Sequence, residues 1–416
     1  MSLRTAILIM SAFGVISDSI LIAFYPQFFE ARYGVTNAVH TGAYIAAISI
    51  AVMCMLPVWA YVARYVETMH LVVYTQFAAG ALCLMAIWAP TVQVFWVLTM
   101  LMYMVKASYL LMFPYLMRLE KSQDHAVVIG LLTVIVYIAG IFGAAVGGLS
   151  LQRLGPDFSL MLMAGGDFIQ MLLCLYLICS GKVVKVISRD EDNRAKVVPK
   201  RSREALVKLM QLSLLMLLFD FSAYLIRPFF TLYWENTTQI TNQMLTGFVF
   251  AIPGMVALIA LMLKRRWLSP PWWVEHSQFN LLLAAIGMLM QATPSMWLIL
   301  LGRCLYGWAI FQLVVKLEVT LFKVSTPESY ARDFSVANFF QNFGVLLSSF
   351  GAGYVVSLLG IPMTFVIAAV GMVLTLIFDR SVFELDRQQP LKAQSDDVTS
   401  GEQPPLLAAQ GGAGHD

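Results

Sequence analysis

The sequence predicts an all-α polytopic membrane protein with twelve transmembrane helices in two six-helix repeats. The first observation is compositional, because 59% of the 416 residues are hydrophobic and only 12% are charged. A soluble domain contains about 25% charged residues, and the mean hydropathy of this chain is +0.76. The second is that apolar runs of bilayer-spanning length recur along the whole chain. The third is that sequence landmarks in the first half return in the second half at a nearly constant offset.

The apolar runs define the twelve predicted helices. The run at 278–293 is short for a span, and the run at 295–322 is long enough to tilt or to extend beyond the bilayer. The first bundle contains helices at 5–28, 40–62, 70–89, 92–117, 127–151 and 158–180, and the second contains helices at 206–233, 243–263, 278–293, 295–322, 333–358 and 361–380.

These runs divide the chain into four parts. Residues 1–180 form an N-terminal six-helix bundle, and residues 206–380 form a C-terminal one. Residues 181–205 are basic and contain no aromatic side chain, which favours a cytoplasmic linker lying against anionic headgroups. Residues 381–416 are rich in Gln, Pro, Gly and Ala, which predicts a disordered cytoplasmic tail.

Lysine and arginine placement predicts the orientation. If the N-terminus is cytoplasmic, twenty-one Lys and Arg residues lie on the cytoplasmic side, and only Arg32 and Arg153 lie on the other. Cytoplasmic loops carry the excess of positive charge. We therefore expect both termini to be cytoplasmic. The short loops and the lack of a targeting signal favour a multi-pass protein of a bacterial cytoplasmic (inner) membrane, and we expect a monomer.

Three landmarks reveal the internal repeat. Val35-Thr36-Asn37 followed by Thr41-Gly42 returns as Ile240-Thr241-Asn242 followed by Thr246-Gly247. Leu154-Gly155 returns as Leu359-Gly360, and both of these landmarks are offset by 205 residues. The Asp18–Pro26 spacing returns as Asp220–Pro228, at an offset of 202 residues. Parallel repeats of helix bundles, with the substrate near the midplane between them, are a recurring transporter architecture.

With this repeat, residues 5–380 resemble the major facilitator superfamily. One departure is the loop after the second helix, because Pro57 to Arg64 lacks the acid of the superfamily's Gly-x-x-x-Asp-Arg pattern. The fifth helix carries Gly143, Gly147 and Gly148, which resembles the glycine pattern of exporting families without its proline. Small residues at this spacing also predict close helix packing.

Six charged residues lie deep in the predicted helices, where a charge is costly and indicates function. In the resembled superfamily, helices one, four, seven and ten line the central cavity, and five of the six charges fall on those helices. Asp220 and Arg227 are seven residues apart, which places them on one face of a continuous helix. The six are Asp18, Lys106, Asp167, Asp220, Arg227 and Arg303.

Their chemistry suggests two groups of site residues. Asp18 and Asp220 are proton-coupling candidates, because burial and nearby cations tune the proton affinity of a carboxyl. The substrate-binding candidates are cations that grip an anion, supplemented by two amides on the eleventh helix. Three cavity cations against two acids favour an anionic or carboxylate-bearing solute. The substrate-binding candidates are Lys106, Arg227, Arg303, Gln341 and Asn342.

The same residues also permit structural interpretations. The acids Asp18 and Asp220 could pair with Lys106 or Arg227 only to hold the helices together. Arg303 could satisfy helix carbonyls, and Asp167, which is not on a cavity helix, is assigned a structural role.

These observations predict a proton-coupled secondary transporter, most readily one that exports a small polar metabolite such as a carboxylate siderophore. The alternative within transport is a proton symporter that imports an organic anion, a sugar or an iron chelate. A non-transporting receptor or scaffold is the alternative of another class. The scattered histidines and the lack of a nucleotide-binding loop predict no enzyme activity, no metal and no cofactor. The expected partners are a small molecule, a proton and the lipid bilayer, and not nucleic acid.

Overall fold

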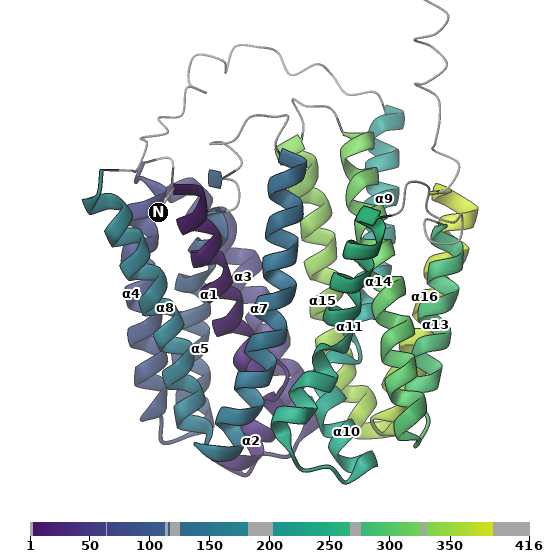
Figure 1. Ribbon diagram of the computed structural model, residues 1–416, viewed down its shortest axis with the longest axis horizontal. Helices are drawn as coiled ribbons and strands as arrows, with labels where there is room; N and C mark the ends of the chain where they lie inside the picture. Colours follow the sequence, from purple (N-terminus) through teal and green to yellow (C-terminus); the bar gives the residue numbers. More distant parts are fainter. Residues whose placement is uncertain are drawn as a thin grey trace, which may run out of the picture.

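The computed structural model describes residues 3–63, 65–112, 115–116, 125–181, 203–266, 276–325 and 330–385. They form a bundle of helices in which the N-terminal and C-terminal halves lie side by side (Figure 1). The N-terminal half contains α1 (Leu3–Ile22), α2 (Tyr25–Tyr33), α3 (Ala38–Val62), α4 (Thr68–Ile87), α5 (Val92–Lys106), the 3-10 helix η1 (Ala107–Leu111), α7 (His125–Arg153) and α8 (Pro156–Cys179).

The C-terminal half repeats this order. Its elements are α9 (Arg203–Tyr224), the 3-10 helix η3 (Arg227–Phe229), α10 (Phe230–Thr238), α11 (Gln243–Arg266), α13 (Ser277–Gln291), α14 (Met296–Val324), α15 (Tyr330–Leu359), α16 (Pro362–Phe378) and the π-helical turn η4 (Asp379–Phe383). Each half encloses its own apolar core of aliphatic and aromatic side chains.

The predicted all-α membrane fold is confirmed. Eleven helical segments of the described chain are long and apolar enough to cross a membrane. The helix predicted at 278–293 is observed as α13, whose 15 residues are fewer than the roughly 20 that a span requires. The helix predicted at 295–322 is the 29-residue α14.

The helices predicted at 5–28 and 206–233 are interrupted, which corrects their description as continuous, and the helix predicted at 92–117 changes from α5 to the 3-10 helix η1 after Lys106. Helix one, predicted at 5–28, ends at Ile22 and restarts as α2, with Pro26 in its first turn. The helix predicted at 206–233 ends at Tyr224, and Pro228 lies in the 3-10 turn that follows. Proline has no N–H to donate and disfavours helical geometry in the preceding residue. The two halves are therefore bent at equivalent points.

Several predicted features lie outside the described residues. These include most of the linker, residues 182–202, as well as Arg64 of the loop after α3. The last helix extends past the predicted end at residue 380 into η4, and the remainder of the predicted tail, residues 386–416, also lies outside the described part.

The repeated landmarks have equivalent local structures. Asn37 caps α3 by accepting a hydrogen bond from the Val39 N–H at 2.9 Å, and Asn242 accepts one from the Leu245 N–H at 3.1 Å near the start of α11. Gly155 and Gly360 adopt positive φ values of 86° and 85°, which glycine tolerates without strain. The repeat therefore preserves the residues that start helices at corresponding positions.

Glycines bring the two bundles into close contact at the end that carries α2 and α10. A Cβ at Gly42 of α3 would lie 2.6 Å from the Ser349 carbonyl oxygen of α15, and a Cβ at Gly247 of α11 would overlap the Ala144 carbonyl of α7. Two further contacts follow the same symmetry, because Gly148 lies against Gln243 and Gly353 against Ala38. Each contact has its counterpart 205 residues away.

The remaining glycines predicted for helix packing lie on α7 against α1. A Cβ at Gly143 would lie 2.7 Å from the Ser19 Cβ, and one at Gly147 would overlap the Ile20 carbonyl. The glycine-rich stretch of α7 thus allows this helix to approach α1 of its own bundle and α11 of the other bundle.

Candidate substrate and proton site

A cavity of about 250 Å³ lies between the two bundles, and we call it the central cavity. Residues of α1, α2, α3, α5 and η1 line one side, and residues of α9, η3 and α15 line the other. A solute held here would contact residues of both bundles. The polar residues of the lining are Asp18, Tyr25, Ser49, Tyr103, Lys106, Tyr109, Tyr224, Arg227 and Ser349.

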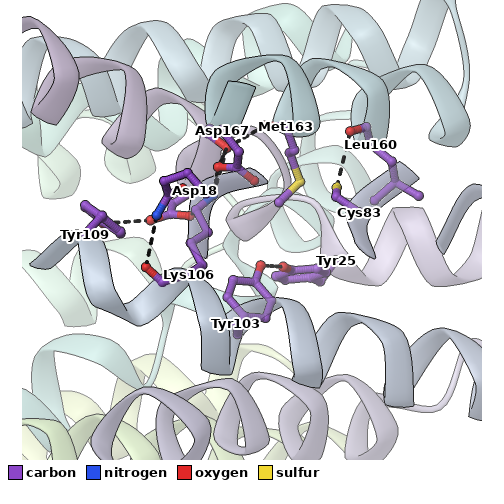
Figure 2. Close-up of polar contacts among 11 residues, drawn as sticks. Asp18, Tyr25, Cys83, Tyr103, Lys106, Tyr109, Leu160, Met163 and Asp167 are labelled. Carbon is purple, nitrogen blue, oxygen red and sulfur yellow. Dashed lines mark hydrogen bonds and ion pairs between the residues drawn. The ribbon is translucent and has the colours of Figure 1, made fainter. Parts of the chain in front are cut away.

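On the N-terminal side, three charged residues form one cluster, the lysine triad of Lys106, Asp18 and Asp167. The Lys106 Nζ lies 2.8 Å from Asp18 Oδ1 and 2.7 Å from Asp167 Oδ1 (Figure 2). It also donates a hydrogen bond to Ser17 Oγ at 2.9 Å. An ammonium has three N–H donors, and each has an acceptor here. The cluster therefore joins α1, α5 and α8 through one buried cation.

The two acids of the triad differ in exposure. The Asp18 side chain is 30% exposed, and its Oδ2 accepts a hydrogen bond from the Tyr109 hydroxyl at 2.8 Å. Asp167 is fully enclosed, with the Ser17 hydroxyl 3.4 Å from its Oδ1 (Figure 2). Asp18 is thus the acid of the triad that lines the cavity, whereas Asp167 holds Lys106 from behind.

The charges of the triad do not balance. Two ionised carboxylates around one ammonium give a net charge of −1, and Asp167 Oδ2 is buried with no hydrogen-bond partner among the described residues. One negative charge of the cluster therefore has no cationic partner among the described residues.

On the C-terminal side the charges are separated. Asp220 of α9 is 8% exposed, the Gln341 side chain of α15 lies beside it, and its buried Oδ2 has no hydrogen-bond partner in the described part of the chain. No cation lies within ion-pair distance of Asp220 in the described ranges. Asp220 and Gln341 are each four residues, about one helical turn, from the cavity-lining residues Tyr224 and Val345.

Arg227 follows the break in the C-terminal repeat and lines the central cavity. Its guanidinium carbon lies 4.9 Å from the centre of the Tyr224 ring and 5.9 Å from that of Phe250. No acid pairs with it among the residues that the structure describes. Asp220 and Arg227 were expected on one face of a single helix, but the chain leaves the helix after Tyr224, and the two residues lie on separate segments.

Arg303 does not line this cavity. It is 4% exposed on α14, where it donates hydrogen bonds to the Val249 carbonyl at 3.4 Å and to the Phe250 carbonyl. Its guanidinium carbon lies 3.8 Å from the centre of the Phe230 ring. These contacts correspond to the structural interpretation of Arg303, in which the side chain satisfies helix carbonyls.

Asn342 is not among the residues that line the cavity. Its side-chain amide donates hydrogen bonds to the carbonyl and the side chain of Asn338 within α15. Of the predicted site residues, the structure brings Asp18, Lys106 and Arg227 together around the cavity. The expected excess of cations over acids at the cavity is therefore not observed, because Asp167 pairs with Lys106 and Arg303 does not line the cavity. Arg227 remains as the cavity cation without an acidic partner among the described residues.

Sequence reasoning missed the role of Asp167 in the lysine triad. A buried acid needs a partner, and Lys106 is the lysine deep in a predicted helix of the same half, so their pairing could have been inferred. The cavity tyrosines carried no comparable signal. Tyr25 and Tyr103, whose hydroxyls lie 2.6 Å apart, come from segments 78 residues apart in sequence.

Comparison with known proteins supports the fold. No family model matches the sequence, and no curated protein matches it significantly in sequence. Solved structures are similar, including the nucleoside transporter NupG (15% identity, TM-score 0.67), which covers 91% of this chain and 99% of its own. The human organic anion transporter MFSD10 (TETRAN) matches at 13% identity and a TM-score of 0.66, over 90% of this chain and 98% of its own.

A third similar structure is a bacterial homologue of the human lysosomal transporter Spinster, in an inward-facing and occupied conformation. It has 12% identity and a TM-score of 0.71, and the alignment covers 92% of this chain and 97% of the homologue. At these identities the likeness concerns the fold. The chain therefore has the fold of the major facilitator superfamily transporters over most of its length.

Proposed function

We propose that this protein is a proton-coupled secondary transporter of a small organic anion, and that the central cavity is its substrate site. The observation that carries the proposal is the arrangement of charges around the cavity. The lysine triad contributes Asp18 and Lys106 on one side, and Arg227 faces the cavity from the other bundle. The substrate and the proton would thus bind at adjacent groups.

The proposed coupling uses competition for Lys106. An anionic group of the substrate would interact with Arg227 and draw the Lys106 ammonium away from Asp18. Asp18 would then be a cavity-facing carboxylate that has lost its cation and lies beside the anionic group of the substrate, which favours proton uptake. Release of the substrate would return Lys106 to Asp18 and expel the proton. The substrate and the proton would therefore stabilise each other's binding through one shared side chain.

Asp220 is proposed as a second proton site. It is buried beside the uncharged amide of Gln341, with no cation within ion-pair distance among the described residues, so a proton could bind there without displacing an ion pair. Its position one turn from Tyr224 would link protonation to α9, which also leads to Arg227 through the break at Pro228.

The substrate is proposed to be small and to carry an anionic group. The central cavity of about 250 Å³ is below the roughly 300–1,000 Å³ range of pockets for drug-sized ligands, which favours a compact metabolite over a siderophore in this conformation. An anionic substrate also agrees with the function named for MFSD10, an organic anion transporter.

Binding of the anion and the proton together corresponds to symport, which would drive import along an inward proton gradient. Export is the alternative, favoured by the resemblance of the α7 glycine pattern to that of exporting families, and it would require the proton and the anion to occupy the cavity in turn. A receptor or scaffold without transport is the other alternative. The charged side chains around the cavity disfavour it, because a charge at membrane depth is costly unless it has a function.

The test compares anionic metabolites inside cells and in the medium, with the gene deleted and restored. Accumulation of one compound in deleted cells, with its loss from the medium, would establish export. A compound left unused in the medium would establish import. The compound would then be added to proteoliposomes containing the purified protein and a trapped pH indicator.

Substrate-dependent proton movement is expected with the natural sequence and not with Asp18→Asn. Transport without proton movement would refute the coupling, and no difference between deleted and restored cells for any anion would refute the anionic substrate.

A further inference from the structure

The short helices α2 and α10 close one end of the bundle, and they meet at a polar contact between the halves (Figure 1). Gln27 of α2 is 7% exposed and donates its side-chain amide to Thr231 Oγ1 at 3.1 Å and to Glu235 Oε2 at 3.2 Å. Thr231 in turn donates to the Ala23 carbonyl. We call the contact of Gln27, Thr231 and Glu235 the α2–α10 gate.

Glu235 is an unusual member of this gate. Its Oε1 is buried and has no hydrogen-bond partner in the described part of the chain. The side chains that approach the carboxyl from the packed elements are uncharged, Gln27 from α2 and Thr246 from α11. The charged group whose field reaches it is Glu30 of α2, which is also an acid.

This geometry disfavours a negative charge in the closed state. A buried acceptor without a donor costs free energy, and an ionised carboxylate costs more than a neutral acid. Separation of α2 from α10 would expose Glu235 to water and remove that penalty. Proton binding at Glu235 and closure of the gate must then favour each other.

We propose that Glu235 is a proton-binding site of the α2–α10 gate, which is protonated when the gate is closed and ionised when the gate is open. The inference extends the proposed transport function but depends only on movement of the two bundles. Lower pH on this side of the membrane stabilises the closed gate, and higher pH favours its opening. The site is separate from the lysine triad and from Asp220.

The experiment measures gate opening directly and needs no substrate. Spin labels are attached at Ala31→Cys on α2 and Asn236→Cys on α10, two exposed positions, after replacement of the five native cysteines. Distances between the labels are recorded by pulsed electron paramagnetic resonance in lipid nanodiscs between pH 5 and 9. One carboxyl that binds its proton only in the closed state changes the closed-to-open ratio by up to tenfold per pH unit.

Four variants decide the result. Glu235→Gln is expected to remove the part of the pH dependence of the closed-to-open ratio that Glu235 contributes, and to keep the closed population high at every pH. Glu235→Asp keeps a carboxyl and should keep a pH dependence. Thr231→Val should weaken closure at every pH but leave the slope unchanged. Glu30→Gln, which removes the neighbouring exposed carboxylate, is the matched control: it should keep the slope and shift the midpoint of opening to lower pH, because a like charge near Glu235 is lost.

An unchanged slope in Glu235→Gln overturns the proposal, and so does an equal loss of slope in Glu30→Gln. If Glu235→Gln does not fold, the other variants decide. The proposal is overturned if Glu235→Asp loses the pH dependence of the closed-to-open ratio, or if Thr231→Val changes the slope of that dependence. Because the readout is a distance, these results are independent of whether the metabolite comparison identifies a transported anion.

Discussion

The polar centres of the two bundles differ although their scaffolds repeat. In the N-terminal bundle, Lys106 is held between two carboxylates at 2.8 and 2.7 Å. In the C-terminal bundle, Asp220 and Arg227 lie on separate segments, and in the described residues neither has a partner of opposite charge. The first centre is a paired cluster, and the second keeps an acid and a base apart.

The glycine contacts between the bundles, in contrast to the charged centres, are equivalent in the two halves. Gly42 against Ser349 and Gly247 against Ala144 are related by the 205-residue offset, and so are the two further contacts at the same end. The repeat therefore preserved the surfaces on which the bundles meet, while the charged residues diverged. This division separates a shared scaffold, which the repeat preserves, from charged centres that differ between the halves.

The largest effect is expected from removing the cation of the paired centre. Lys106→Met leaves the enclosed Asp167 and the partly exposed Asp18 without their cation, and removal of one partner from a buried ion pair costs about 3–5 kcal/mol. Transport should be lost and the midpoint of thermal unfolding should fall. The double variant Lys106→Met with Asp167→Asn removes one of the stranded charges and should recover part of the stability, but not transport. Equal stability of the two variants would contradict the triad.

Asp220→Asn tests the separated centre. Because Asp220 has no cation to leave unpaired, the neutral amide should change the free energy of unfolding by less than about 1 kcal/mol. Proton movement coupled to the substrate should nevertheless be abolished. Proteoliposomes with a trapped pH indicator measure this, with thermal unfolding of the same preparation as a control. Unchanged coupling with normal expression would exclude Asp220 from the mechanism.

The two arginines of the C-terminal bundle should separate binding from folding. Arg227→Gln removes the cavity cation and is expected to raise the KM for the transported anion by roughly 10–100-fold, since a charge-assisted hydrogen bond contributes about 1.5–3 kcal/mol. Arg303→Gln removes donors from the Val249 and Phe250 carbonyls and should lower thermal stability with a smaller change in KM. Transport kinetics and unfolding curves measured on both variants check this, and the reverse pattern would place the substrate at Arg303.

Much of the fold could be predicted from the sequence because its signals are local. Apolar runs fix the helices, and Asn37 and Gly155 keep their roles in the second half because capping and positive φ depend on neighbouring residues. The breaks after Ile22 and Tyr224 were harder to predict from the sequence, since a proline near a helix end is also compatible with an unbroken helix.

The candidate site could be predicted only in part, because it depends on which helix faces meet. Asp18, Lys106 and Arg227 were found as deep charges and do line the cavity. The engagement of Arg303 with carbonyls of α11 and the pairing of Asp167 with Lys106 require the packing of helices distant in sequence. The lining tyrosines are chemically like many others in the chain, so only the structure distinguishes them.

The smallest expected effect tests the symmetry of the glycine contacts. Gly42→Ala and Gly247→Ala each place a methyl group against a carbonyl of the other bundle, and such overpacking costs about 1–3 kcal/mol. Both should shift the spin-label distances across the α2–α10 gate towards the open state, and by similar amounts. Gly254→Ala, on the same helix as Gly247, meets its nearest neighbour at an ordinary 3.5 Å and should leave the distances unchanged. A shift for only one of the two glycines would mean that the bundles do not share this contact equally, although their sequences repeat it.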